Sequence, residues 1–104
     1  MSFTTDAGTF ISLDEAVSWT ANHRASSPGG VKAQFYGKTK IEQILQQVGC
    51  TGLRIYYAID NTDTQVLVLI GTDANGNDIL STMILERGLS CPPNCGIGSP
   101  LQGL

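Results

Sequence analysis

The stretch that decides the fold is Gln65-Val-Leu-Val-Leu-Ile-Gly71, an almost unbroken run of apolar residues rich in β-branched side chains. Such a run is typical of a buried β-strand. Turn-forming residues border it on both sides, at Asp60–Thr64 and at Asp73–Asp78. Within the second turn, Asn75-Gly76 supplies residues that tolerate a positive φ angle. This pattern predicts a strand with a hairpin connection at each end.

Two further apolar stretches adjoin those turns and complete a three-stranded meander. Leu53–Ile59 precedes the run and Ile79–Leu85 follows it. Short connections make neighbouring strands antiparallel. Earlier in the chain, Val31–Tyr36 alternates apolar and polar residues, which predicts a fourth strand.

Two helices are predicted from capping boxes followed by apolar residues at helical spacing. Ser12-Leu-Asp-Glu15 opens a helix over residues 12–25, because a serine hydroxyl can accept the amide proton three residues later. Thr39-Lys-Ile-Glu42 opens a second over residues 39–48. Gly49 follows it, where a left-handed residue commonly ends a helix.

The order of these elements is α-β-α-β-β-β, which predicts an α+β fold in two layers. We expect a four-stranded, mainly antiparallel sheet with two helices on one face. The 104 residues suit one domain. It would comprise an N-terminal segment (1–11), a core (12–85) and an irregular tail rich in Cys, Pro and Gly (86–104).

Composition and charge exclude several classes of partner. Charged residues make up 14% of the chain, against about 25% in an average soluble domain. With a net charge of −3, binding to a nucleic-acid backbone is not expected. The N-terminus lacks the pattern of a signal peptide, and the longest apolar run, Val66–Ile70, is far shorter than the ~20 residues that span a bilayer. We therefore expect a cytoplasmic protein without a membrane or nucleic-acid partner.

One face of the predicted sheet is unusually apolar for a surface without helices. An antiparallel sheet that faces water on one side should alternate apolar and polar residues. Alternation instead predicts an interaction face composed of Arg54, Tyr56, Leu67, Leu69, Leu80 and Ile84. We interpret this as a non-enzymatic interaction module that forms a homodimer or binds a protein partner through that face. The C-terminal tail or a small ligand are the alternative covers, and Arg54 with Tyr56 would suit a planar or anionic ligand.

The cysteines suggest a different function, that of a metal- or thiol-dependent protein. Cys50, Cys91 and Cys95 together with His23 would make a Cys3His zinc site. The spacing of Cys91-Pro-Pro-Asn-Cys95 differs from the C-x-x-C of thiol oxidoreductases. An odd number of cysteines in a reducing compartment argues against a disulfide framework, although a single bridge between Cys91 and Cys95 stays open. The alternative is a purely structural role, in which the segment forms a rigid turn with buried thiols. No cofactor is predicted.

No catalytic residue is predicted. Asp73-x-Asn75-x-Asn77 begins like a calcium-binding loop but fails at two later positions, where Asp78 and Ile84 replace the required Gly and Glu. His23 is the sole histidine, and no nucleophile elbow, zinc-protease or phosphate-loop pattern is present. An ordinary hairpin turn accounts for the acidic cluster.

Three segments carry a resemblance to small uncharacterised bacterial proteins of the Bacteroidetes type. They are Gly52-Leu-Arg-Ile-Tyr-Tyr57, Asn75-Gly-Asn-Asp78 and Cys91-Pro-Pro-Asn-Cys-Gly96. The resemblance covers most of the chain after residue 10. It implies a bacterial cytosolic protein, and no activity, cofactor or substrate.

Overall fold

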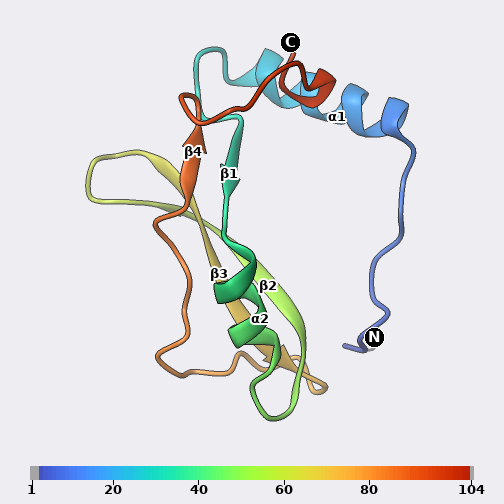
Figure 1. Ribbon diagram of the computed structural model, residues 1–104, viewed down its shortest axis with the longest axis vertical. Coiled ribbons are helices and arrows are strands. Elements are labelled where there is room, and N and C mark those ends of the chain that lie inside the picture. The colour runs from blue at the N-terminus through green and yellow to red at the C-terminus, as the bar shows by residue number, and fades with distance from the viewer. Residues whose placement is uncertain (1–2, 104) are drawn as a thin grey trace. The chain divides into compact units, whose positions relative to one another are not determined.

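The computed structural model describes residues 3–103, and within them the fold is α+β (Figure 1). In that range the elements are α1 (Leu13–Ser26), β1 (Ala33–Phe35), α2 (Lys38–Leu45), β2 (Cys50–Ile59), β3 (Gln65–Asp73), β4 (Leu89–Cys91) and the short 3-10 helix η1 (Pro100–Gln102). The α+β class and the two helices are confirmed.

The predicted single sheet is wrong, because the described strands form two separate antiparallel pairs. β1 pairs with β4, and β2 pairs with β3. The chain correspondingly divides into two compact units. The hairpin unit comprises Met1–Gly8 with Tyr36–Gly88, and the clasp unit comprises Thr9–Phe35 with Leu89–Leu104. The prediction that residues 1–104 form one domain stays a prediction.

The third meander strand, predicted over residues 79–85, does not form. This segment touches the outer edge of β3 only through isolated bridges, Thr72 with Asp78 and Leu69 with Leu85. The chain between Asp78 and Leu85 is longer than the stretch of β3 that it follows, so its surplus residues loop out. Ser81 stabilises this loop, since its hydroxyl accepts the amide proton of Met83. Local side-chain bonding of this kind competes with a strand ladder.

Helix α1 begins as predicted. The Ser12 hydroxyl accepts the amide proton of Glu15 at 3.1 Å, and Asp14 and Glu15 lie in the positively polarised first turn. None of its described side chains is buried. Capping and local backbone bonds therefore support this helix more than a hydrophobic core does.

Helix α2 begins earlier than predicted, and the capping box at Thr39 is wrong. Gly37 is the N-cap and gives no side-chain hydrogen bond, so Thr39 lies inside the first turn. The helix packs on the hairpin through Ile44, which is 2% exposed. A Cβ atom added at Gly71 of β3 would lie 3.2 Å from Ile44 Cγ2, so the missing side chain allows this close approach. The helix also ends earlier than predicted, at Leu45 with Gln46 as its C-cap, so Gly49 does not cap it, although its φ of 81° is left-handed as predicted.

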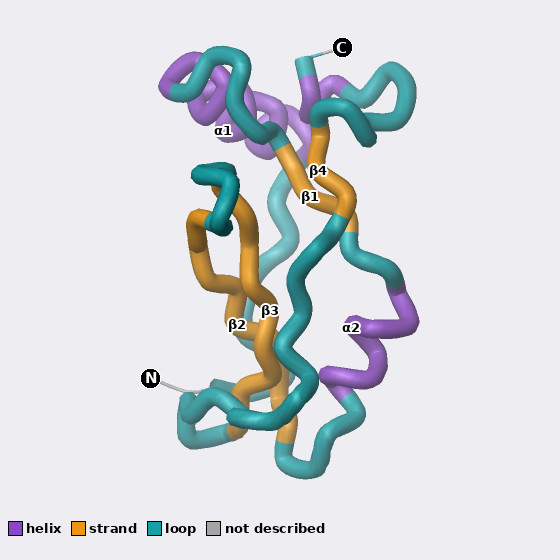
Figure 2. The backbone as a smooth tube through the Cα atoms, turned by 90° about the vertical axis from the view of Figure 1, so that its left-hand side faces the viewer, coloured by secondary structure: helices purple, strands orange, loops and turns teal. Residues whose placement is uncertain are grey.

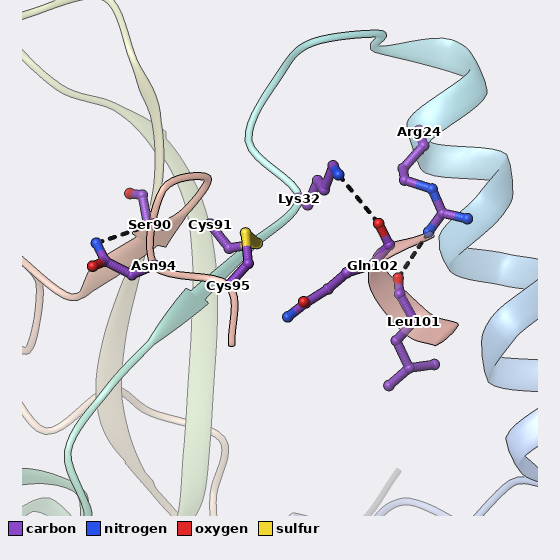
Figure 3. Close-up of a disulfide and its surroundings, with 8 residues drawn as sticks. All are labelled: Arg24, Lys32, Ser90, Cys91, Asn94, Cys95, Leu101 and Gln102. Carbon is purple, nitrogen blue, oxygen red and sulfur yellow. Dashed lines mark hydrogen bonds between the residues drawn. A yellow bond between two sulfur atoms is a disulfide. The ribbon is translucent and has the colours of Figure 1, made fainter. Parts of the chain in front are cut away.

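The clasp unit is built from the two segments that flank Tyr36–Gly88 along the chain. β1 and β4 pair in the register Ala33–Cys91, Gln34–Ser90 and Phe35–Leu89. The tail that we predicted to be irregular thus contributes a strand and η1. Figure 3 shows that basic side chains hold the tail: Arg24 donates to the Leu101 carbonyl at 2.8 Å and Lys32 to the Gln102 carbonyl at 3.1 Å.

No helix among residues 3–103 has the length and apolar character needed to cross a membrane.

Candidate functional site

The strand register corrects the predicted interaction face. In an antiparallel pair, residues directly opposite each other share a face. Tyr57 lies opposite Leu67, and Ile55 opposite Leu69. Arg54 and Tyr56 lie opposite Ile70 and Val68, on the other face. The predicted set therefore divides between two faces, with Arg54 and Tyr56 on one and Leu67 and Leu69 on the other. Counting alternation through each strand alone could not supply the offset between strands.

Asp78 is the polar centre of the hairpin unit. Its carboxylate accepts a hydrogen bond from Arg54 at 2.8 Å and one from the Thr72 hydroxyl at 3.2 Å. The Tyr56 hydroxyl donates a third. Arg54 also donates to the Gly76 carbonyl at 3.0 Å, so it ties β2 to the turn after β3. Arg54 and Tyr56 were predicted from the sequence as ligand-binding groups. Both side chains instead bind Asp78 within the chain.

These donors hold the pKa of the Asp78 carboxyl below its ordinary value. The Tyr56 hydrogen bond has the largest effect, and the Thr72 hydroxyl and the charge of Arg54 add to it. Partial burial acts in the opposite direction. The carboxylate is therefore ionised at neutral pH and neutralises Arg54 on this face.

The N-terminal segment lies against the start of β2. The Thr51 hydroxyl donates to the Phe3 carbonyl at 2.7 Å, and the Phe3 ring centroid lies 5.6 Å from the guanidinium carbon of Arg54. A cavity of about 350 Å³ remains there. Its lining consists of Phe3, Thr4, Ala7, Thr51, Gly52, Leu53, Arg54, Ile55 and Thr72.

The outer edge of β2 carries backbone groups that no other described strand uses. Leu69 exchanges both of its backbone hydrogen bonds with Leu85, at 2.9 Å each, so these groups point away from β2. Its partner Ile55 then points its own amide and carbonyl away from β3. Alternation assigns the same orientation to Tyr57 and Ile59. Within residues 3–103, β3 is the only strand paired with β2 (Figure 2).

The side chains along this edge are apolar and exposed. Ile55 is 52% exposed, Tyr57 84% and Ile59 70%, whereas Leu69 on the same face is 4% exposed. Helix α2 lies to one side of the hairpin (Figure 2), and it contacts both strands. We call Ile55–Ile59 the open edge. Long, uncharged edges are avoided in most sheet proteins, because unpaired backbone groups there can bind another chain.

Two other members of the predicted face lie on the loop that replaces the third strand. Leu80 is 84% exposed and Ile84 is 49% exposed. Ile84 lines a second cavity of about 210 Å³ beside α2. Neither residue is in a strand, so they do not extend a sheet face.

The proposed Cys3His set does not assemble in the oxidised protein. Cys91 and Cys95 form a disulfide (Figure 3), so neither provides a thiolate for a metal. Cys50 keeps a free thiol, which lies 3.3 Å from the Gly52 carbonyl. His23, the fourth member of that set, is half-buried and its Nε2 atom lies 2.8 Å from the Val31 carbonyl. Across the described residues, no group of three or more metal-binding side chains is present.

The acidic turn is an ordinary hairpin turn, as predicted. Asp73 Oδ1 accepts the amide protons of Asn75 and Asn77 at 2.9 and 3.0 Å. Gly76 has φ 83°. The carboxylate thus serves the backbone of its own turn.

Comparisons with models of protein families, with curated proteins and with solved structures find no match. The site is therefore interpreted from its own geometry.

The open edge was not predicted from the sequence, because a single four-stranded sheet was expected and only its faces were considered. One signal was present: Ile55–Ile59 contains no charged residue and no proline. Sequence analysis also missed the bonds of Asp78, which it explained only as a turn residue. That contact joins residues far apart in the chain, and spacing alone gives no sign of it.

Proposed function

We propose that this protein is a non-enzymatic interaction module that binds an extended strand along the open edge of β2. The observation that carries the proposal is the coincidence of two features at Ile55, Tyr57 and Ile59. Their backbone groups point outward from the hairpin, and their side chains are more than half exposed. Strand addition to a sheet edge uses both, since main-chain hydrogen bonds provide affinity and alternate side chains provide specificity.

The surroundings of the edge support this mode of binding. Arg54 and Asp60 flank the open edge in sequence, and Asp78 holds and neutralises Arg54. An incoming strand therefore meets apolar side chains and unpaired peptide groups along Ile55–Ile59, and it does not desolvate an unpaired Arg54. Burial of a charge without a partner would be costly, whereas burial of these apolar side chains is favourable.

The metal- or thiol-dependent alternative has less support. Two of its four proposed ligands are joined in the disulfide. A disulfide also persists most readily in an oxidising compartment. The cytoplasmic location, expected from the N-terminal sequence, remains a prediction that this feature does not favour.

A peptide titration tests the proposed function. The probe is a short soluble peptide of alternating threonine and valine, added to isotope-labelled protein at about 50 μM, where weak self-association is negligible. We expect amide shifts at Ile55, Tyr57 and Ile59, with smaller shifts at Tyr56 and Ala58, whose amides face β3. The same peptide N-methylated at alternate residues is the control, because it cannot donate to the edge. Shifts that ignore this alternation, or none along β2, would refute strand addition.

A further inference from the structure

We infer that the strand bound at the open edge is β2 of a second copy of this chain, in an antiparallel pair with its two-fold axis at Tyr57. This inference rests on the proposed function and names the partner of the same site. It converts two β2–β3 hairpins into one continuous four-stranded sheet.

The open edge is self-complementary. Outward-facing residues must pair with outward-facing residues, so only Ile55, Tyr57 and Ile59 and their alternating neighbours can form the bonded pairs. Around Tyr57, Ile55 faces Ile59 of the second copy and Tyr57 faces its own equivalent. Tyr56 then faces Ala58 of the second copy, a large side chain beside a small one. These pairs supply about six main-chain hydrogen bonds.

The described part of the hairpin unit lacks the features that keep most edge strands from pairing. Such edges usually carry a lysine, a proline, a bulge or a covering segment. The open edge has no charged residue or proline, and the irregularity in β2 lies between Cys50 and Gly52, outside it. A second copy is the one partner certain to be present at the concentration of the protein itself.

The N-terminal segment favours this register over those with the axis nearer the start of β2. Moving the axis to Tyr56 or Ile55 would bring the second strand alongside Leu53. There the N-terminal residues Phe3 and Thr4 border β2 across the cavity described above. The Tyr57 register stays on the part of the strand that is most exposed.

The flanking residues are compatible with the same register. It places Arg54 opposite Asp60 of the second copy, so no two residues of like charge face each other at either end. Asp78 already holds and neutralises the Arg54 guanidinium, so Asp60 meets a neutral ion pair there. Asp60 is exposed and uses only its Oδ1 atom for the turn, bonding Thr62 and Thr64. The Tyr56 register would instead place Arg54 opposite alanine.

The area involved predicts a weak dimer. Three apolar side chains and one strand edge cover roughly 400 Å² per chain, which is below the range of standard interfaces. We therefore expect a monomer at about 10 μM and a dimer as the main species at about 1 mM. Sedimentation equilibrium over that range measures the mass directly.

Two surface variants distinguish pairing at the open edge from non-specific hydrophobic association. Tyr57→Lys should raise the dissociation constant more than tenfold, since it places two like charges on the axis. Val48→Lys is the matched control, because Val48 is 99% exposed in the same unit but lies outside the strand. It should leave the dissociation constant unchanged. Amide spectra confirm that both variants stay folded. Equal loss of dimer in both variants would overturn the inference.

Cross-linking tests the register. In a Cys50→Ser background, which removes the free thiol, Tyr57→Cys should form an intermolecular disulfide, because equivalent Cα atoms on the axis lie about 5.5 Å apart. Tyr56→Cys should not, since it faces residue 58. The reverse result would overturn the Tyr57 register. A chain that stays monomeric at about 1 mM but still binds the threonine–valine peptide refutes the second copy and leaves the proposed function intact.

Discussion

Different interactions stabilise the interior of each of the two units of this protein. The hairpin unit has a small hydrophobic core, in which Ile44, Val66, Leu69 and Ile70 are buried. The clasp unit has Cys91 as its only buried apolar residue among those described, and α1 has none. It relies on a disulfide, a helix cap and basic side chains that bind tail carbonyls. A unit that buries little apolar surface needs such additional cross-links and hydrogen bonds to be stable.

This difference predicts that the two units respond separately to perturbation. Amide hydrogen exchange can report on each, through Leu69 in the hairpin unit and Lys32 in the clasp unit. The Leu69 amide bonds to Leu85, and the Lys32 amide bonds to the Cys91 carbonyl at 2.7 Å. If the units behave as one cooperative domain, both amides will change together in every experiment below.

The largest expected effect comes from the core of the hairpin unit. Ile44→Ala should lower its free energy of unfolding by about 2–5 kcal/mol, because it leaves a cavity between α2 and β3. Leu69 should lose exchange protection while Lys32 keeps it. Leu45→Ala, at a 43% exposed neighbour in the same helix, is the control and should have a much smaller effect. Equal loss at Leu69 and Lys32 would show that the units unfold together.

The disulfide gives the reciprocal experiment. Replacing Cys91 and Cys95 together by serine should destabilise the clasp unit by about 2 kcal/mol, the chain-entropy value for so short a loop. The Lys32 amide should exchange faster, and Leu69 should be unaffected. Cys50→Ser provides the matched control, since it removes a thiol that forms no bridge. Unchanged protection at Lys32 would mean that strand pairing alone holds the clasp unit.

Removing the charge of Asp78 should have a smaller effect, again within the hairpin unit. Asp78→Asn weakens the bonds from Arg54 and Tyr56 and should lower the free energy of unfolding at neutral pH, by less than Ile44→Ala does. Thermal unfolding measures it. Asp63→Asn is a suitable control, because Asp63 is exposed with φ 64°, which asparagine tolerates.

The same variant should alter the pH dependence of unfolding. The folded protein lowers the pKa of Asp78 below the ordinary value of 3.8, so the unfolded chain binds this proton more readily. The stabilisation is complete above 3.8 and is lost as pH falls through the lower folded pKa. Asp60, whose pKa is lowered by bonds from Thr62 and Thr64, contributes in the same direction. The asparagine variant should therefore lose less stability in acid than the parent, and an identical acid profile would contradict this.

The elements that sequence analysis predicted well are those whose causes are local. The Ser12 cap, the Asn75-Gly76 turn and the β2–β3 hairpin each depend on neighbours in the chain. The errors concern relations between distant segments. β1 pairs with β4 because the tail returns to it, and nothing in the alternation of Val31–Tyr36 specifies that partner. The predicted interaction face was misassigned for the same reason, since a face is defined only once the register between strands is known.

The smallest expected effects concern α1. One alanine substitution at its cap should destabilise the helix, and another in its middle should stabilise it. Ser12→Ala removes the acceptor for the Glu15 amide and should cost the clasp unit about 1 kcal/mol. Ser18→Ala, at an exposed position in the middle of α1, should instead stabilise the helix by a few tenths of a kcal/mol, because alanine is the better helix former. Circular dichroism and exchange at Lys32 measure both. A helix supported mainly by its own backbone should respond to both changes, whereas one fixed by packing would be insensitive to the second.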